Sequence, residues 1–565
     1  MLSPFSWGGA KSAPMLVTDL LLDLCEAQGC KALFGIPDPQ FFALFNAAHA
    51  RGWQVVAPHH EAAGGFMAEG WARISGKPAL CVGSLGPGVA NLAPAIAHAR
   101  AEGGKVLFLG GRRAGMAAEQ KGRFQHAEHF PAMAAHAGWS AQASHPVGAV
   151  AAVEAALHGL SRGRFSAAFI ELEPEALTGE VVWPSGLDVA SALPDLAPAL
   201  ALIAQAQSPI LLAGHGVHTA RAGDALRDLA RKLACPVVQT PSAMAVVEGL
   251  ESVSVPYGFS PVTRAVVEAS DLVIALGTQL GDQLHFGQNR HWKVGRDSRR
   301  WIRIDHDPAM LKGADVAMLG DMAQVLPALA EACPQRDSQP SLTAWSAAHS
   351  AYRAAQATAA RAFPAQPVNP ARLVVEACEA MPEGTILARD GGASVLFQLA
   401  YGQGASRDVL WSQNSGHLGT GLPLAIGAML AAPDRPALLL TGDSALLFHL
   451  AELETAARLC LPLVVAVAVD HQWGLEVGMS RLNLGPSAET GLGWGCATRF
   501  DLLAQGFGCD GAYVDHADTL APALQEAFTA AQAKRRPQVL HVAIDPKANA
   551  ENMPALGEFA SWFAV

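Results

Sequence analysis

The sequence predicts an α/β protein in which mainly parallel sheets are flanked by helices. Short apolar segments with strand composition alternate with longer segments of helical spacing along the 565 residues. Many of these apolar segments run into glycine-rich turns, as parallel strands do before a helix. Hydrophobic residues make up 51% of the chain and charged residues 16%, so there is apolar surface for more than one core. The length suggests about three or four domains of ordinary size.

The first third of the chain shows this alternation clearly. A helix with many small residues, which must pack closely, begins near Glu61. A strand before Pro37 and another before Gly86 each end in a turn. The expected elements are a helix at 17–28 and strands at 32–36, 78–83 and 167–173.

The rest of the chain continues the pattern. The Pro- and Gly-containing stretch 174–194 and the Ala-, Ser-, Gln- and Pro-rich stretch 334–370 are expected to be linkers, the second around a helix. We expect an irregular loop at 479–495 and a covering tail at 549–565. The remaining expected elements are strands at 208–213, 236–238, 272–276, 301–305, 386–390, 436–440 and 462–469, and helices at 226–233 and 445–461.

Composition excludes several classes of protein. The formal net charge of −11 argues against a general binder of nucleic acid or of membrane surfaces. The nine cysteines form no Cys-x-x-Cys pair, so neither a zinc site nor a disulfide framework is expected. The first 14 residues lack the pattern of a signal peptide, and the longest apolar runs are too short to span a bilayer. We expect a cytoplasmic protein with reduced thiols.

Two polar turns stand at the ends of consecutive expected strands. One is Gly442-Asp443-Ser444, and the other begins at Asp470, which is 470 − 443 = 27 positions later. Because parallel strands end at the same edge of a sheet, the two aspartates are expected to meet there. A helix beginning near Ser444 would direct free N–H groups toward an anion such as a diphosphate. Two carboxylates beside a diphosphate suit Mg²⁺, which binds few protein ligands.

These turns resemble the thiamine-diphosphate signature, which usually reads Gly-Asp-Gly and, after a spacer, Asn-Asn. This chain has Ser444 in place of the second glycine and Asp470 in place of an asparagine. The Ser444 hydroxyl is able to bond a phosphate oxygen. Asp470 keeps an oxygen ligand but adds a negative charge, which would weaken cofactor binding unless a cation offsets it.

The first third is similar to the pyrimidine-binding domain of acetolactate-synthase-like enzymes. Phe-Gly-Ile-Pro at 34–37, His-Glu-Ala-Ala at 60–63 and Gly-Pro-Gly at 86–88 occur in family order. The resemblance implies that Glu61 exchanges a proton with the aminopyrimidine ring and so activates the thiazolium carbon. Gln125, in the segment 121–125, would bond the substrate carbonyl, or is only a surface amide. The other residues implied at this half of the site are Gln40 and His60 near the substrate, and Pro37, Gly86 and Asn91 at the cofactor.

The last third is similar to the diphosphate-binding domain of the same enzymes. Leu418 falls on the bulky apolar residue that holds the cofactor in its bent shape. Glu476 falls where pyruvate-decarboxylase-like relatives have a glutamate that protonates the substrate after decarboxylation, although a solvent-exposed glutamate is an equal alternative. The resemblance implies metal ligation by Asp443, Asp470 and the backbone carbonyl of Gln472. The implied cofactor-binding residues are Ala393, Ser394, His417, Leu418, Gly442, Asp443, Ser444, Ala445, Asp470, Gln472, Trp473 and Gly474.

The middle third resembles the central domain of the family, which binds FAD or an ADP or CoA moiety in some relatives. Gln279 and Gln283 stand where FAD-binding relatives usually carry arginines, so FAD is not expected. The Leu-His-Phe-Gly segment 284–287 looks more like 2-hydroxyacyl-CoA lyases and oxalyl-CoA decarboxylases. An acyl-CoA would need a basic pocket for its phosphates, although a solvated basic loop is the simpler interpretation. The basic residues nearby are Arg290, Lys293, Arg296, Arg299 and Arg300.

The resemblance covers nearly the whole chain and predicts its organisation. We expect a pyrimidine-binding domain at 1–185, a central domain at 186–345, a linker at 346–367 and a diphosphate-binding domain at 368–565. The implied activity is thiamine-diphosphate- and Mg²⁺-dependent cleavage or formation of a C–C bond next to a carbonyl, most simply by a 2-oxo acid decarboxylase or carboligase. A homodimer or homotetramer is implied, because the two cofactor-binding halves pair across chains. The alternatives are a 2-hydroxyacyl-CoA-lyase-like or benzaldehyde-lyase-like enzyme acting on an acyl compound or 2-hydroxy ketone, and a non-catalytic cofactor-binding relative.

Overall fold

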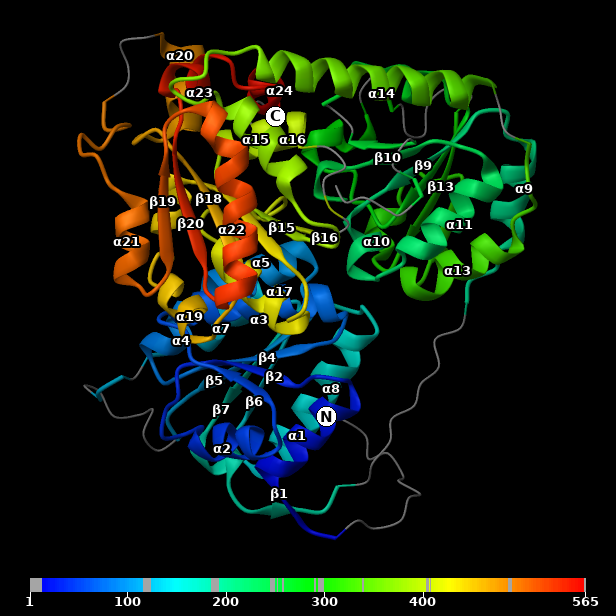
Figure 1. Cartoon of the computed structure of the whole chain (residues 1–565). Coiled ribbons are helices and arrows are strands. Elements are labelled where there is room, and N and C mark those ends of the chain that lie inside the picture. The colour runs from blue at the N-terminus through cyan, green and yellow to red at the C-terminus, as the bar shows by residue number, and fades with distance from the viewer. Residues whose placement is uncertain are drawn as a thin grey trace. The chain divides into compact units, whose positions relative to one another are not determined.

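The computed structural model contains three six-stranded sheets, and every strand pair within them is parallel. Helices flank each sheet, which confirms the predicted fold class (Figure 1). The chain divides into two compact units, residues 1–72 with 77–192 and residues 73–76 with 193–565, and each is described separately. The structure describes residues 13–114, 123–125, 127–183, 193–243, 249–250, 253–256, 259–288, 291–292, 299–337, 340–402, 406, 408–485 and 490–562.

The first unit carries one of the three sheets, with strand order β3-β2-β4-β5-β7-β6. Its core is a continuous apolar cluster between the sheet and helices α1, α2 and α8. The elements are β1 (Met15–Leu16), α1 (Val17–Ala27), β2 (Ala32–Gly35), α2 (Phe42–Ala50), β3 (Gln54–Val56), α3 (Glu61–Ser75), β4 (Ala79–Gly83), α4 (Pro87–Asn91), α5 (Ala93–Glu102), β5 (Val106–Gly111), α7 (Phe130–His136), β6 (Trp139–Ala143), α8 (Pro146–Ser161), β7 (Ala167–Leu172), η1 (Pro174–Leu177) and β8 (Glu180–Val181).

Helix α3 begins at Glu61, as expected, and its small residues allow close packing. A Cβ atom on Gly65 would lie 2.4 Å from the Cβ of Ala95 on α5 and 3.0 Å from the ring of Phe108 on β5. A Cβ on Gly64 would lie 2.9 Å from Pro58. Larger residues at these positions would push α3 away from its neighbours and displace Glu61.

The second unit contains the central sheet, with strand order β11-β10-β9-β12-β13-β14. Numbered within the sheet, this order is 3-2-1-4-5-6, the doubly wound arrangement. The elements are α9 (Ala197–Gln205), β9 (Pro209–Ala213), α10 (His215–Thr219), α11 (Gly223–Leu233), β10 (Val237–Gln239), η2 (Pro241–Ala243), β11 (Ser254–Pro256), α12 (Pro261–Ala269), β12 (Leu272–Leu276), η3 (Asp282–Gly287), β13 (Arg300–Asp305), η4 (Pro308–Leu311), β14 (Val316–Leu319) and α13 (Met322–Ala332).

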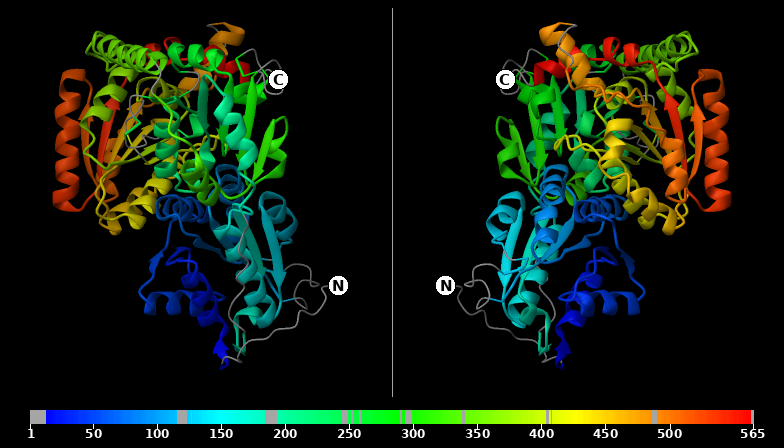
Figure 2. Two further views of the ribbon diagram at one scale, coloured as in Figure 1. Left: turned by 90° about the vertical axis from the view of Figure 1, so that its right-hand side faces the viewer. Right: turned by 90° about the vertical axis from the view of Figure 1, so that its left-hand side faces the viewer.

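The same unit contains the C-terminal sheet, with strand order β16-β15-β17-β18-β20-β19. Numbered within each sheet, this order and that of the first unit are both 2-1-3-4-6-5. Helices lie on both sides of the C-terminal sheet (Figure 2). The elements are α15 (Pro370–Ala380), β15 (Ile386–Arg389), α16 (Ala393–Tyr401), β16 (Asp408–Leu410), α17 (Gly421–Ala431), β17 (Ala437–Gly442), α18 (Asp443–Leu447), α19 (Glu452–Arg458), β18 (Leu463–Val469), α20 (Gly474–Leu484), α21 (Phe500–Gly506), β19 (Asp510–Val514), η5 (Ala517–Thr519), α22 (Leu520–Lys534), β20 (Gln538–Ala543), α23 (Pro546–Glu551) and α24 (Leu556–Trp562).

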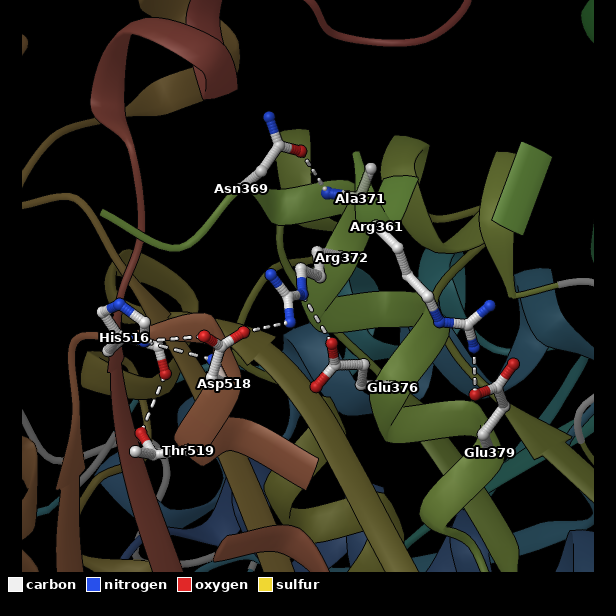
Figure 3. A network of polar contacts seen from close by, with 9 residues as sticks. All are labelled: Arg361, Asn369, Ala371, Arg372, Glu376, Glu379, His516, Asp518 and Thr519. Atoms are coloured by element: carbon white, nitrogen blue, oxygen red, sulfur yellow. Dashed lines mark hydrogen bonds and ion pairs between the residues drawn. The ribbon is translucent and has the colours of Figure 1, made fainter. Parts of the chain in front are cut away.

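A long helix, α14 (Pro340–Arg361), contacts α12 beside the central sheet and α15 and α16 beside the C-terminal sheet. Residues 346–361 of the expected linker therefore belong to a helix. Polar contacts hold the neighbouring α15 in place (Figure 3). Arg372 on α15 donates to Glu376 at 2.6 Å and to Asp518 at 2.8 Å, which links α15 to the segment before α22. Asn369 caps the start of α15 by accepting the Ala371 N–H at 2.9 Å.

Three expected elements differ from the structure. The expected helix 445–461 is two helices, α18 and α19, because the intervening turn is held by His449, whose Nδ1 lies 2.8 Å from the Gly419 carbonyl oxygen. The expected loop 479–495 begins as helix, since α20 extends to Leu484 and packs against α23. The expected tail 549–565 contains the second half of α23 and all of α24.

Candidate active site

The candidate residues of the first unit are centred on Glu61, whose side chain is buried at the start of α3. The Asn91 side-chain amide donates to Glu61 Oε2 at 2.9 Å. A Cβ on Gly88 would lie 3.0 Å from Glu61 Oε1, so the glycine makes room for the carboxylate. The structure thus brings together Glu61 and Asn91, two of the residues that the resemblance implied at the cofactor. His60 is exposed and accepts the Ala62 N–H at 3.1 Å, which is a capping role, and Pro37 is exposed.

One of the two candidate glutamines of the first unit, Gln125, lies at a small cavity of about 10 Å³. Gln125 and Gly86 line this cavity, and a Cβ on Gly86 would lie 2.8 Å from the Gln125 carbonyl oxygen. Gln125 itself has a left-handed φ of 56°, which is uncommon for a residue other than glycine. Gln40 donates to the Leu172 carbonyl at 2.7 Å. Of the segment 121–125, Lys121 and Gly122 lie outside the described residues.

The candidate residues of the second unit line one cavity of about 860 Å³. Three helices begin at this cavity: α16 at Ala393, α18 at Asp443 and α20 at Gly474. They follow β15, β17 and β18, which are adjacent strands that include the point where the strand order reverses. Free N–H groups at helix starts favour an anion. The cavity includes all predicted cofactor-binding residues of this unit except Ala445, which is buried within α18.

Two carboxylates lie at the strand ends of this cavity. Asp443 is 1% exposed and accepts the Ser444 N–H at 2.7 Å and the His471 N–H at 2.8 Å. The second of these bonds joins the end of β17 to the residue after Asp470. Burial, and then the nearby Asp470, raises the pKa of Asp443 to about 7. Burial also raises the pKa of Asp470.

A buried carboxylate beside a half-buried one is an environment in which a bound cation is stabilising. The described residues contain no group of three or more His, Cys, Asp or Glu side chains that could hold a metal. The oxygens of Asp443 and Asp470 at neighbouring strand ends are a donor set that suits a hard cation such as Mg²⁺, which takes its other ligands from an anion and from water.

The glycine-rich turn before α17 is organised by Asp390, a residue that the sequence analysis did not single out. Its carboxylate accepts the N–H groups of Gly391 at 2.7 Å, Gly419 at 3.1 Å and Gly421 at 2.7 Å. These bonds place His417 and Leu418 at the cavity wall. Asp390 directly follows a strand and precedes two glycines, and this pattern could have identified it from the sequence.

Glu476 lines the cavity on the first turn of α20, but its side chain is exposed. The sequence left two alternatives open at this position, a catalytic carboxyl and a solvent-exposed glutamate, and the described residues of the chain leave the side chain exposed. The reason is its place on the solvent side of α20, whose buried residues are Gly474, Val477 and Gly478.

Comparison with known proteins identifies the family. The sequence matches the models of three thiamine pyrophosphate enzyme domains: the N-terminal TPP binding domain at residues 15–136, the central domain at 196–329 and the C-terminal TPP binding domain at 390–542. The chain belongs to the thiamine pyrophosphate enzymes. The family resemblance seen in the sequence is thus confirmed, and thiamine diphosphate (thiamine pyrophosphate) is the cofactor that two of these domains bind.

Relatives of this thiamine pyrophosphate enzyme include decarboxylases and synthases. A probable 2-ketoarginine decarboxylase AruI of Pseudomonas aeruginosa is 31% identical, with 85% of this chain and 88% of that protein covered. An acetolactate synthase large subunit of Parasynechococcus marenigrum is 27% identical, with 80% and 76% covered. The solved structure of a thiamine diphosphate-dependent 4-hydroxybenzoylformate decarboxylase of Rhodococcus jostii has the same fold, with a TM-score of 0.78 at 20% identity, covering 94% of this chain and 99% of that one.

This thiamine pyrophosphate enzyme is therefore of the decarboxylase and acetolactate-synthase-like type, a lyase or carboligase. None of the helices in the described part of the chain has the length and apolar character needed to span a membrane.

Proposed function

We propose that the chain is a thiamine-diphosphate- and Mg²⁺-dependent 2-oxo acid decarboxylase or carboligase. The observation that carries the proposal is the cavity of the second unit, where three helices begin beside the buried carboxylate of Asp443 and the half-buried carboxylate of Asp470. The chemistry that the cofactor supplies is a nucleophilic carbon for the substrate carbonyl and a sink for the electrons of the broken bond.

The chain's own residues have three tasks in this proposal. Asp443, Asp470 and the Gln472 carbonyl hold Mg²⁺, and the helix starts hold the diphosphate. Glu61 holds a proton for the cofactor ring, in the orientation set by Asn91. Leu418 acts by shape at the cavity wall. We also propose that the chain works as a homodimer or homotetramer, which sedimentation analysis of the purified protein tests directly.

The acyl-CoA alternative has less support among the described residues. Arg299 donates to backbone carbonyls of residues 267, 268, 270, 291 and 292, so its guanidinium is already committed. Arg300 is 3.2 Å from Asp315. Arg290, Lys293 and Arg296 lie outside the described residues.

We further propose that the central sheet works without FAD. Gly214 and Gly216, at the turn after β9, are explained by packing, because a Cβ on Gly214 would lie 2.2 Å from the Gly277 carbonyl oxygen. Gln279 and Gln283, the residues in place of arginines, line the large cavity. A flavin absorbance band in the freshly purified protein would contradict this.

Two measurements test the proposed function. Thiamine diphosphate with Mg²⁺ should raise the melting temperature, because a ligand present at one hundred times its Kd stabilises the folded state by about 2.7 kcal/mol. CO₂ release is then measured with pyruvate, an aromatic 2-oxo acid and a 2-oxo acid with a guanidinium side chain, and acyl-CoA cleavage in parallel. Release of CO₂ from a 2-oxo acid supports the proposal, whereas acyl-CoA cleavage alone would favour the lyase.

A further inference from the structure

Asp470 poses an electrostatic problem that the sequence analysis left open. It brings a second, half-buried carboxylate to the cavity that holds Asp443, close to where an anionic diphosphate would bind. The expected solution was a nearby cation. Among the described residues that line the cavity, the cationic side chain is Arg389, which donates instead to the Gly402 carbonyl at 3.0 Å.

The structure shows a different solution, in which two neutral amides donate to one oxygen of Asp470. The Asn549 Nδ2 atom lies 2.7 Å from Asp470 Oδ2, and the Gln472 Nε2 atom lies 3.0 Å from the same oxygen. Hydrogen bonds to an ionised carboxylate are stronger than those between neutral groups. They stabilise the charged, metal-binding form without placing a competing cation in the site.

Asn549 is held firmly for this contact. It lies on α23, whose start is capped by Asp545 through the N–H groups of Lys547 and Ala548. The Asn549 side chain is 4% exposed and lines the cavity. An ionised carboxylate only accepts hydrogen bonds, so the NH₂ group of the amide must face Asp470. The Asn549 Oδ1 atom is buried and has no hydrogen-bond partner among the described residues.

Gly474 leaves the space that this contact needs. A Cβ at this position would lie 2.4 Å from Asn549 Nδ2 and 3.1 Å from Asp470 Oδ2. The glycine at the start of α20 therefore allows an amide from α23 to reach a carboxylate at the end of β18. Asp470 and Asn549, which this hydrogen bond joins, are 79 positions apart along the chain.

We propose that Asn549 is a positioning residue, which orients Asp470 and disperses its charge so that the carboxylate can serve as a metal ligand. This inference rests on the proposed Mg²⁺ and thiamine diphosphate site. It explains how the chain tolerates an aspartate at this position, and it assigns a function to the C-terminal segment that the sequence analysis treated only as a cover.

The test is a double-mutant cycle on metal binding. Asn549→Leu keeps the size of the side chain but removes the amide, and Asp470→Asn removes the charge that the amide serves. The Kd for Mg²⁺ is measured at saturating thiamine diphosphate, through the fluorescence of tryptophans such as Trp473 at the cavity. We expect Asn549→Leu to weaken Mg²⁺ binding by about 10- to 100-fold. In the Asp470→Asn background the same change should cost less than about threefold.

Comparing Asn549→Leu in the wild-type and Asp470→Asn backgrounds separates a positioning role of Asn549 from a packing role. If Asn549 only packs α23 against α20, its loss will weaken binding equally whether residue 470 is charged or neutral, and the proposal fails. Asn552→Ala, at the exposed end of α23, is the matched control and should leave the Kd unchanged. Should Asn549→Leu not fold, Gln472→Leu removes the second amide donor and should show the same dependence on Asp470.

Failure of the proposed role of Asn549 can be told apart from failure of the proposed reaction. Because the readout is metal binding, a wild-type chain that binds both ligands but releases no CO₂ would contradict the proposed reaction and leave the role of Asn549 to be decided by the cycle. A wild-type chain that shows no Mg²⁺-dependent binding of thiamine diphosphate overturns both.

Discussion

Glu61 is the residue on which proton transfer in the first unit is expected to depend. Its carboxylate is buried, accepts a hydrogen bond from Asn91, and lies where a Cβ on Gly88 would come within 3.0 Å of it. Glu61→Gln keeps the shape of the side chain but removes its proton exchange. We expect kcat to fall by about 10²- to 10⁴-fold, while the Kd for thiamine diphosphate changes much less. Steady-state kinetics and a binding titration on the same preparation measure both quantities.

The matched control is Glu175→Gln, on the exposed surface of the same unit, which should keep wild-type kcat. A Glu61→Gln enzyme as fast as this control would remove Glu61 from proton transfer. Equal losses in kcat and cofactor affinity would instead assign it a binding role.

Individual residues of the candidate site differ in how far the sequence could predict their positions. Asp443 and Asp470 were predictable, because each directly follows a buried strand and adjacent parallel strands end together. The Asn549 contact was not, since it depends on how α23 docks 79 positions later in the chain. The sequence also could not decide between a buried and an exposed Glu476, because its exposure depends on which face of α20 packs against α23.

At the scale of elements, buried strands were the most predictable features. The expected strand at 462–469 is β18 (Leu463–Val469), and all seven of its residues are buried. Helix ends were less predictable, as the break between α18 and α19 shows. That break depends on His449 contacting the Gly419 carbonyl, a tertiary interaction that local spacing does not contain.

Helix α14 carries a buried histidine that should make the fold sensitive to acid. His349 is 1% exposed and stacks on Trp345 with ring centroids 5.6 Å apart. Burial, and then the charge of Arg353, lowers its pKa to about 4. The unfolded chain, with a histidine pKa of about 6.5, therefore takes up the proton first. The contribution to stability is full above pH 6.5 and is lost as the pH falls toward 4.

His349→Gln removes this titration. Between pH 7.5 and pH 5, the wild type should lose up to about 2 kcal/mol more unfolding free energy than the variant. Urea denaturation at the two pH values measures the difference. The exposed His49→Gln is the control, and it should lose as much as the wild type. If His349→Gln loses as much as this control, the buried histidine is not an acid-sensitive element.

At the scale of the whole molecule, the sheet of the first unit and the C-terminal sheet of the second share one strand order. The candidate residues are divided between them, with Glu61 in the first and Asp443 in the second. The repeated rhythm of strands and helices predicted three similar sheets. It did not predict the shared order, because strand order depends on which strands pair and not on their spacing along the chain.

Within the second unit, an ionic contact joins the parts built on its two sheets. Asp408 on β16 lies 2.9 Å from Arg221, which follows α10, and 2.7 Å from Arg435, which precedes β17. Burial alone would raise the pKa of Asp408, but the two arginines hold it below its usual value. Because the folded pKa is lowered, this stability is present above pH 4 and is lost as the pH falls through the folded pKa.

Asp408→Asn should therefore lower the unfolding free energy of the second unit at pH 7 by about 1–2 kcal/mol, a value reduced because Arg221 is partly exposed. Urea denaturation at pH 7 measures the loss of unfolding free energy. High salt should reduce the difference in unfolding free energy between variant and wild type, because screening weakens the ion pairs of the wild type. Asp224→Asn is the matched control, since Asp224 pairs with Arg227 at the surface of the same unit and its side chain is 87% exposed. That variant should change the free energy by less than about 0.5 kcal/mol. If the two variants lose the same amount, the Asp408 contact is an ordinary surface ion pair and does not hold the two parts together.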